Sequence, residues 1–71
     1  MNNDARNAAI RSLEQEIADH EASAKRRETA ARVMTDQERG QWNGLAEMER
    51  QLAARKKAIL ARIRGHAADK E

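Results

Sequence analysis

No residue that breaks a helix occurs in the thirty positions from Ala5 to Met34, which contain neither proline nor glycine. Most of these residues have a high helix propensity. One set of positions recurs in alternating steps of three and four, the spacing that places side chains on one face of a helix. The members of this seam are Ile10, Leu13, Ile17, His20, Ala24, Arg27, Ala31 and Met34. The stretch therefore predicts a long first helix whose face is apolar in its N-terminal half and small or charged after it.

The residues that follow directly predict the start of a second helix. Thr35 and Glu38 have the spacing of a capping box, in which each side chain accepts a hydrogen bond from the other residue's backbone N–H. Asp36 adds negative charge in the first turn, where the helix dipole favours it. The apolar stripe of this helix consists of Trp42, Leu45, Met48, Leu52, Ile59, Leu60 and Ile63, with Ala46 and Ala53 on one flank. We expect the helix to end near Gly65, whose position suits a helix end.

The position of the turn has two interpretations. Gly40 and the Asn43-Gly44 pair are turn signals, and they predict a loop over about 36–44 with the second helix starting near Leu45. The capping box predicts a turn at 34–36 instead, with the two glycines inside a weak or kinked start of the helix. We favour the capping box, because its two side chains satisfy backbone groups that a helix start leaves free.

The two interpretations differ in which residues meet across the helices. The turn at 34–36 pairs Ile17 with Leu52 and Ile10 with Ile59. The later turn pairs Ile17 with Ile63. Both give the same fold class, an all-α antiparallel two-helix hairpin, and the favoured interpretation places the helices at about 5–34 and 36–65. We expect residues 1–71 to form this single domain, with frayed termini at 1–4 and 66–71.

The apolar core of one hairpin is small, because only thirteen residues are large and apolar. Chains this short are rarely stable through their own core alone. A single neighbouring helix also cannot cover the wide stripe of the second helix. We therefore expect a homodimer, most simply a four-helix bundle. The residues expected in the core and dimer contact are Ile10, Leu13, Ile17, Leu45, Met48, Leu52, Ile59, Leu60 and Ile63.

The charges lie in blocks. Residues 14–21 include four acidic side chains, whereas residues 50–68 include six basic ones and no acidic one. One interpretation is a nucleic-acid surface, with contacts from Arg55, Lys56, Lys57, Arg62 and Arg64. The interpretation we favour is charge complementarity, because either hairpin places the acidic block near the basic half of the second helix. The net charge of only +2 and the absence of Phe and Tyr, which stack on bases, support it.

Three residues are candidate contacts for a partner protein, namely Val33, Trp42 and Arg27. Trp42 is the only aromatic residue, and it could anchor a partner or close the turn end of the hairpin against Met34 or Val33. Val33 is a β-branched residue that lies off the main apolar face. Arg27 lies on the seam, where it could reach solvent or specify the register of a partner.

The sequence predicts no catalytic, cofactor or metal site. It contains no nucleophile beside a base and no glycine loop that could bind phosphate. His20 on the seam could be a pH-sensitive element, but a hydrogen-bonded polar break in the core is more common, and Glu16 lies one turn away. His20 and His66 share no motif with metal-ligand spacing.

The stretch Met34-Thr35-Asp36-Gln37-Glu38-Arg39, continued through Leu45 and Leu52, resembles helical hairpins in the scaffolding segments of tailed-phage capsid proteins. That resemblance implies a structural assembly role. The overall plan is similar to Rop, a plasmid-encoded RNA-binding hairpin that dimerises into a four-helix bundle, which implies an RNA- or DNA-binding dimer. The likeness to Rop is one of architecture and carries over no binding residue.

We expect a non-enzymatic protein–protein interaction module, an inhibitor, adaptor or regulator of the kind that phages and mobile elements encode. Its partners would be a second copy of itself and another protein. Nucleic acid is the alternative partner, and neither a membrane nor a small-molecule substrate is expected. The start Met1-Asn2-Asn3-Asp4 and the lack of a long apolar run predict a cytoplasmic protein.

Overall fold

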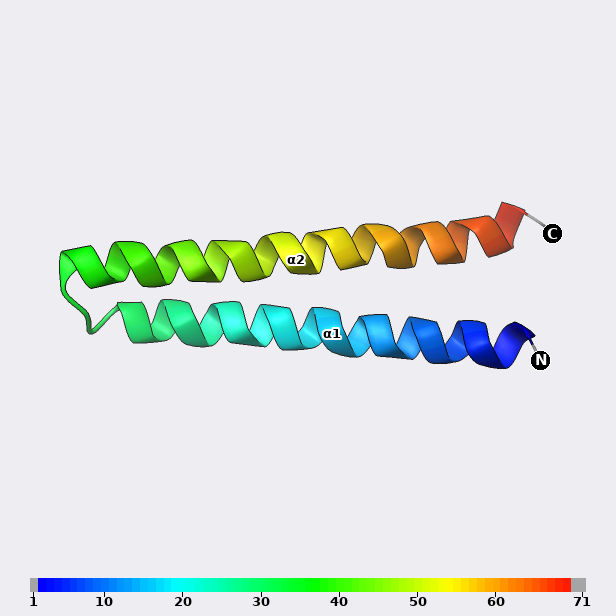
Figure 1. Cartoon of the computed structure of the whole chain (residues 1–71), viewed down its shortest axis with the longest axis horizontal. Coiled ribbons are helices and arrows are strands. Elements are labelled where there is room, and N and C mark those ends of the chain that lie inside the picture. The colour runs from blue at the N-terminus through cyan, green and yellow to red at the C-terminus, as the bar shows by residue number, and fades with distance from the viewer. Residues whose placement is uncertain (1, 70–71) are drawn as a thin grey trace.

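Two long helices packed side by side make up the fold, as Figure 1 shows. The computed structural model describes the backbone of residues 2–69 and the side chains of residues 3–65. Helix α1 runs over Asn2–Ala31 and helix α2 over Asp36–Asp69. The hairpin measures 53 × 18 × 11 Å. Neither helix of the described chain is long and apolar enough to cross a membrane. The prediction of an all-α hairpin is confirmed.

The helix boundaries differ from the predicted ones at three places. Helix α1 begins at Asn2, three residues before the expected start, and ends at Ala31, three residues before the expected end. Helix α2 continues past Gly65, which was expected to end it, because an isolated glycine in a helix costs only about 1 kcal/mol and no proline follows. The frayed ends expected at 1–4 and 66–71 lie partly outside the described residues, and from Asn2 onward the N-terminal segment is helical.

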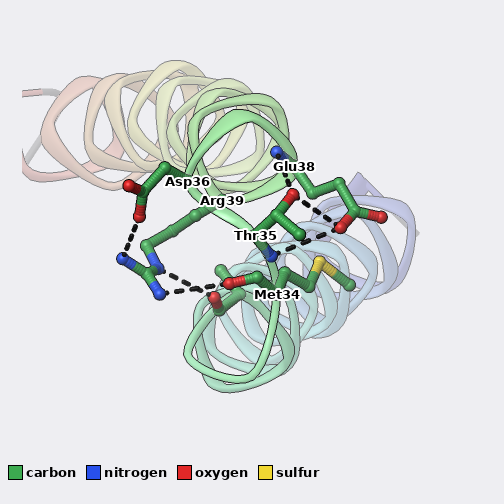
Figure 2. A network of polar contacts seen from close by, with 6 residues as sticks. Met34, Thr35, Asp36, Glu38 and Arg39 are labelled. Atoms are coloured by element: carbon green, nitrogen blue, oxygen red, sulfur yellow. Dashed lines mark hydrogen bonds and ion pairs between the residues drawn. The ribbon is translucent and has the colours of Figure 1, made fainter.

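The capping box forms as predicted at the turn (Figure 2). The hydroxyl of Thr35 accepts a hydrogen bond from the backbone N–H of Glu38 at 3.3 Å. The carboxylate of Glu38 in turn accepts bonds from the N–H of Thr35 at 3.3 Å and from its hydroxyl at 2.7 Å. Gly40 and Gly44 lie inside α2 with ordinary helical backbone angles. The alternative loop over 36–44 is therefore wrong.

Alanine dominates the centre of the interface between α1 and α2. Fully or almost fully buried side chains recur every seven residues on each helix, a spacing typical of coiled coils. They are Ile17, Ala24 and Ala31 on α1 and Ala46, Ala53 and Leu60 on α2. The alanines lie toward the turn and the larger side chains toward the termini. Accordingly the helices lie closest near the turn and diverge toward their free ends (Figure 1).

The predicted pairing of the two helices is wrong. Ile17 packs with Ala53 and Leu60 rather than with Leu52 or Ile63. The connection at 32–35 runs along the hairpin axis beyond the end of α1, so the first turns of α2 overhang it (Figure 1). The turn position was correct, but it does not set the register.

Candidate interaction surfaces

Ion pairs between α1 and α2 line one long side of the hairpin, which we call the ion-paired side. It contains three pairs that join α1 to α2: Glu14–Arg64, Glu21–Lys57 and Glu28–Arg50. Successive pairs are seven residues apart on both helices, and the numbers in each pair add up to 78. The first two have N–O distances of 2.7 and 2.6 Å. This regular ladder favours a single antiparallel register, although exposed pairs add only about 0–1 kcal/mol each.

Ion pairs within the chain engage most of the basic residues considered for nucleic-acid contact. Lys57 and Arg64 belong to the ion-paired side, and Lys56 binds Glu16 at 2.6 Å on the other side of the hairpin. Arg55 and Arg62 make no ion pair with any described side chain. Three of the five cations are therefore partnered within the chain, as charge complementarity predicts.

A polar cluster lies on the opposite side of the interface. His20 Nδ1 is 3.2 Å from a carboxylate oxygen of Glu49, and His20 Nε2 is 2.9 Å from the ammonium of Lys56. Lys56 also donates to Glu16. Because an ammonium can only donate, Nε2 accepts from Lys56 and Nδ1 donates to Glu49, which is the neutral imidazole. His20 is therefore a hydrogen-bonded polar residue that interrupts the apolar interface. This was the more common of the two interpretations given for it.

The polar cluster changes the acidity of its carboxyl groups. The hydrogen bond from Lys56, with a smaller contribution from Ser12, lowers the pKa of Glu16 below its usual value. The hydrogen bond from His20 likewise lowers the pKa of Glu49. Among the described residues no group of three or more His, Asp or Glu side chains could hold a metal ion. The side chain of His66 lies outside the described residues.

The residues proposed as partner contacts near the turn do not form one patch. Val33 is 88% exposed, so it neither packs under the turn nor contacts Trp42 as one interpretation expected. Trp42 is half-buried, and the guanidinium of Arg27 lies over its ring at 5.8 Å. Arg27 also bonds Ser23 through Nε at 3.4 Å. Arg27 and Trp42 therefore form a cation–π contact across the hairpin, on the same side as the polar cluster.

An apolar stripe on α2 remains largely uncovered, and we call it the α2 stripe. It comprises Leu45, Met48, Leu52 and Ile59. Leu45, Met48 and Ile59 are 40%, 59% and 48% exposed, and Leu52 is half-buried. Since Leu52 follows Glu49 by three residues and precedes Lys56 by four, the stripe borders the polar cluster and faces away from the ion-paired side.

The residues predicted for the core and dimer contact divide into two groups. Ile17 and Leu60 are buried in the hairpin, with Ile10 and Leu13 packed against them, and Ile63 is half-buried. The other four are the members of the α2 stripe. Helix α2 thus has two apolar faces that are one residue, or about 100°, apart, and only the face built on Ala46, Ala53 and Leu60 packs against α1.

Arg39 has a role at the turn that the sequence patterns did not predict. Its guanidinium donates to the backbone oxygens of Ala31 and Met34, both at 3.1 Å, and binds Asp36 at 3.1 Å (Figure 2). It thereby satisfies carbonyl groups at the end of α1, which a helix end leaves free. The available signal was a basic residue in the first turn of α2, where the helix dipole disfavours positive charge.

No protein-family model, curated protein or solved structure matches this chain. The hairpin itself presents two unlike long sides. The ion-paired side satisfies its charges within the chain, whereas the opposite side carries the polar cluster and the α2 stripe. Exposed apolar side chains gathered on one helix face are typical of a surface that packs against another molecule.

Proposed function

We propose that this chain is a non-enzymatic protein–protein interaction module that packs the α2 stripe against another helical surface and dimerises into a four-helix bundle. The observation that carries the proposal is the stripe itself, in which Leu45, Met48 and Ile59 remain 40–59% exposed on one side of α2. An inhibitor, adaptor or regulator acts through such a surface. A helix that packs against a partner does so through anchor side chains spaced three, four and seven residues apart, which is the spacing of the stripe.

The accessible surface of the chain supports the need for a partner. The chain exposes 5527 Å², whereas a compact monomer of 8.0 kDa exposes roughly 4,500 Å². The excess of about 1,000 Å² exceeds the roughly 800 Å² that each partner buries in a standard protein–protein interface. One such interface would bring the hairpin to the exposure of an ordinary globular protein.

The charge arrangement favours a protein partner over nucleic acid. Lys56, Lys57 and Arg64 are already paired with glutamates, so contact with phosphate would first require breaking those pairs. Phosphate binding gains its affinity from releasing counterions at unpaired cations. We therefore expect only weak, salt-sensitive binding to RNA or DNA, which a mobility-shift assay across salt concentrations measures.

Sedimentation equilibrium tests the proposal. The wild-type chain should sediment at twice 8.0 kDa at micromolar concentration. Combining Met48→Glu with Ile59→Glu places two carboxylates on the stripe and should yield monomers. The matched control combines Ala54→Glu with Ala61→Glu, two exposed positions on the other side of α2, and should remain dimeric.

Two results contradict the proposal. One is a wild-type chain that stays monomeric and fully helical at high micromolar concentration. The other is equal dissociation of the stripe variant and its control. Circular dichroism of each variant separates loss of association from loss of helix.

A further inference from the structure

We infer that two copies of this chain meet α2 against α2 in antiparallel orientation, with Leu52 on the two-fold axis. This inference rests on the proposed function, and it names the second copy as the occupant of the α2 stripe and states how that copy lies. Three features of the described residues carry it, namely the spacing of the stripe, the distribution of charge along α2 and the polar character of α1 beside the stripe.

Three of the four members of the α2 stripe are spaced symmetrically about Leu52. Leu45 and Ile59 each lie seven residues from Leu52, about 10 Å along the helix axis. A two-fold axis through Leu52 places the two Leu52 side chains against each other and each Leu45 level with Ile59 of the second copy. A surface that pairs with itself in this way forms the isologous interface of a closed dimer.

The charges of α2 favour the antiparallel orientation. Residues 36–49 carry four acidic side chains and one basic side chain, whereas residues 50–64 carry six basic side chains and no acidic one. Arg55 and Arg62 make no ion pair with a described side chain, and antiparallel packing brings both level with the acidic segment 36–49 of the second copy, with Arg55 level with Glu49. Parallel packing would set Arg55 beside Arg55 and align the helix dipoles, and both effects are repulsive.

Helix α1 offers no comparable apolar surface beside the stripe. On that side of the hairpin α1 presents Glu16, which binds Lys56, followed by Ser23 and Arg26, which border the groove next to Trp42. The larger aliphatic residues of α1, Ile10, Leu13 and Ile17, already pack in the hairpin core. The apolar contact between two copies is therefore made by α2.

The absence of cysteine from the sequence permits a direct test by cross-linking. A disulfide forms only where two Cα atoms come within about 7 Å of each other. Under mild oxidation, Leu52→Cys should shift most of the chain from 8.0 kDa to twice that mass in a non-reducing gel. An equal mixture of Leu45→Cys and Ile59→Cys should cross-link, whereas either variant alone should not. Ala61→Cys, on the opposite side of α2, is the control and should stay monomeric in the gel.

Other outcomes overturn the inference in distinguishable ways. Cross-linking of Leu45→Cys alone and of Ile59→Cys alone indicates parallel helices. Failure of Leu52→Cys to cross-link, in a variant that still sediments as a dimer, overturns the antiparallel α2 contact but leaves the proposed function standing. A Leu52→Cys chain and a wild-type chain that are both monomeric by sedimentation overturn both the inference and the proposed function.

Discussion

The two halves of the hairpin are held together differently. Near the turn the centre of the interface is Ala31 and Ala46, followed by Ala24 and Ala53, all of them buried. Near the termini it is Ile17 and Leu60, with smaller contributions from flanking aliphatic residues. We call these the turn half and the open half. The helices approach closely in the turn half and diverge in the open half (Figure 1).

The difference shows how side-chain volume sets helix separation. Alanine lets two backbones approach and packs them by close contact, but it removes little apolar area from water. The turn half compensates with hydrogen bonds, since Thr35, Glu38 and Arg39 satisfy the free backbone groups where the two helices meet. The open half relies on the larger apolar area of isoleucine and leucine.

The open half should show the largest loss on truncation. Ile17→Ala removes the central side chain of the Ile17–Leu60 cluster and leaves a cavity, so the free energy of unfolding should fall by about 2–4 kcal/mol. Urea unfolding at fixed protein concentration measures it. Val33→Ala, at an 88% exposed position, is the control and should change stability by less than about 0.5 kcal/mol. A loss below about 1 kcal/mol for Ile17→Ala would show that this cluster does not hold the open half together.

The turn half should respond in the opposite sense, because it cannot accept larger side chains. Ala24→Leu inserts three carbon atoms where the backbones are close, and it should cost about 1–3 kcal/mol of unfolding free energy. Ala22→Leu makes the same change at an exposed position of α1 and should stay within about 0.5 kcal/mol of wild type. If both variants prove equally stable, the close alanine packing of the turn half is refuted.

The capping box should contribute less to the free energy of unfolding than the buried side chains of either half. Thr35→Ala removes the hydroxyl that accepts the N–H of Glu38, and it should lower the free energy of unfolding by about 1 kcal/mol. Thr35→Ser keeps the hydroxyl and should retain most of that stability. Thermal unfolding of both variants tests this, and a Thr35→Ser chain as unstable as Thr35→Ala would argue against the hydrogen bond as the cause.

One substitution in the turn half should stabilise the hairpin. Gly44 lies inside α2 with a helical backbone, and a Cβ added there meets no atom within 4 Å. Gly44→Ala should therefore raise the free energy of unfolding by about 0.5–1 kcal/mol, because glycine loses more backbone freedom on forming a helix. Calorimetry under matched conditions measures the gain. A clear loss would favour a loop over 36–44, in which glycine is needed.

Acid should weaken the hairpin modestly through its hydrogen-bonded carboxylates. Arg50 lowers the pKa of Glu28, and the hydroxyl and N–H of Thr35 lower the pKa of Glu38. Each pKa is lower in the folded chain than in the unfolded one. The stability these groups add is therefore present above the ordinary glutamate pKa of about 4.3 and is lost as pH falls through the folded value.

Thermal unfolding at several pH values, together with carboxyl NMR titration, checks the expected acid response. Glu38→Gln removes one of the titrating groups and should reduce the loss of stability on acidification. Titration midpoints of Glu28 and Glu38 at or above the ordinary glutamate value would contradict the hydrogen bonds assigned to them.

Local patterns predicted the turn and the buried face of α1 correctly. The capping box involves residues three positions apart, and the eight seam positions, seven in α1 and Met34 just after it, are buried or half-buried. Such features depend on helix geometry alone. The complementarity of the acidic block and the basic half was also predicted, because any antiparallel hairpin brings those segments together.

The buried face of α2 was assigned incompletely for a physical reason. Apolar residues occupy two adjacent faces of this helix, and hydrophobic periodicity does not distinguish them. The face with Ala46 and Ala53 packs against α1, although it offers less apolar area than the face with Leu45 and Leu52. Close approach of the backbones and the ion pairs beside them favour the alanine face, and both depend on contacts between residues far apart in the sequence.

The sequence by itself determined the two helices, the capped turn between them and the attraction of the acidic segment for the basic one. Only the tertiary structure decided the register and the identity of the exposed face. The register depends on how far the connection at 32–35 travels along the axis before α2 begins, and a shift of one residue turns a side chain about 100° around the helix. For that reason Leu60 is buried against Ile17, whereas its neighbour Ile59 remains on the uncovered α2 stripe.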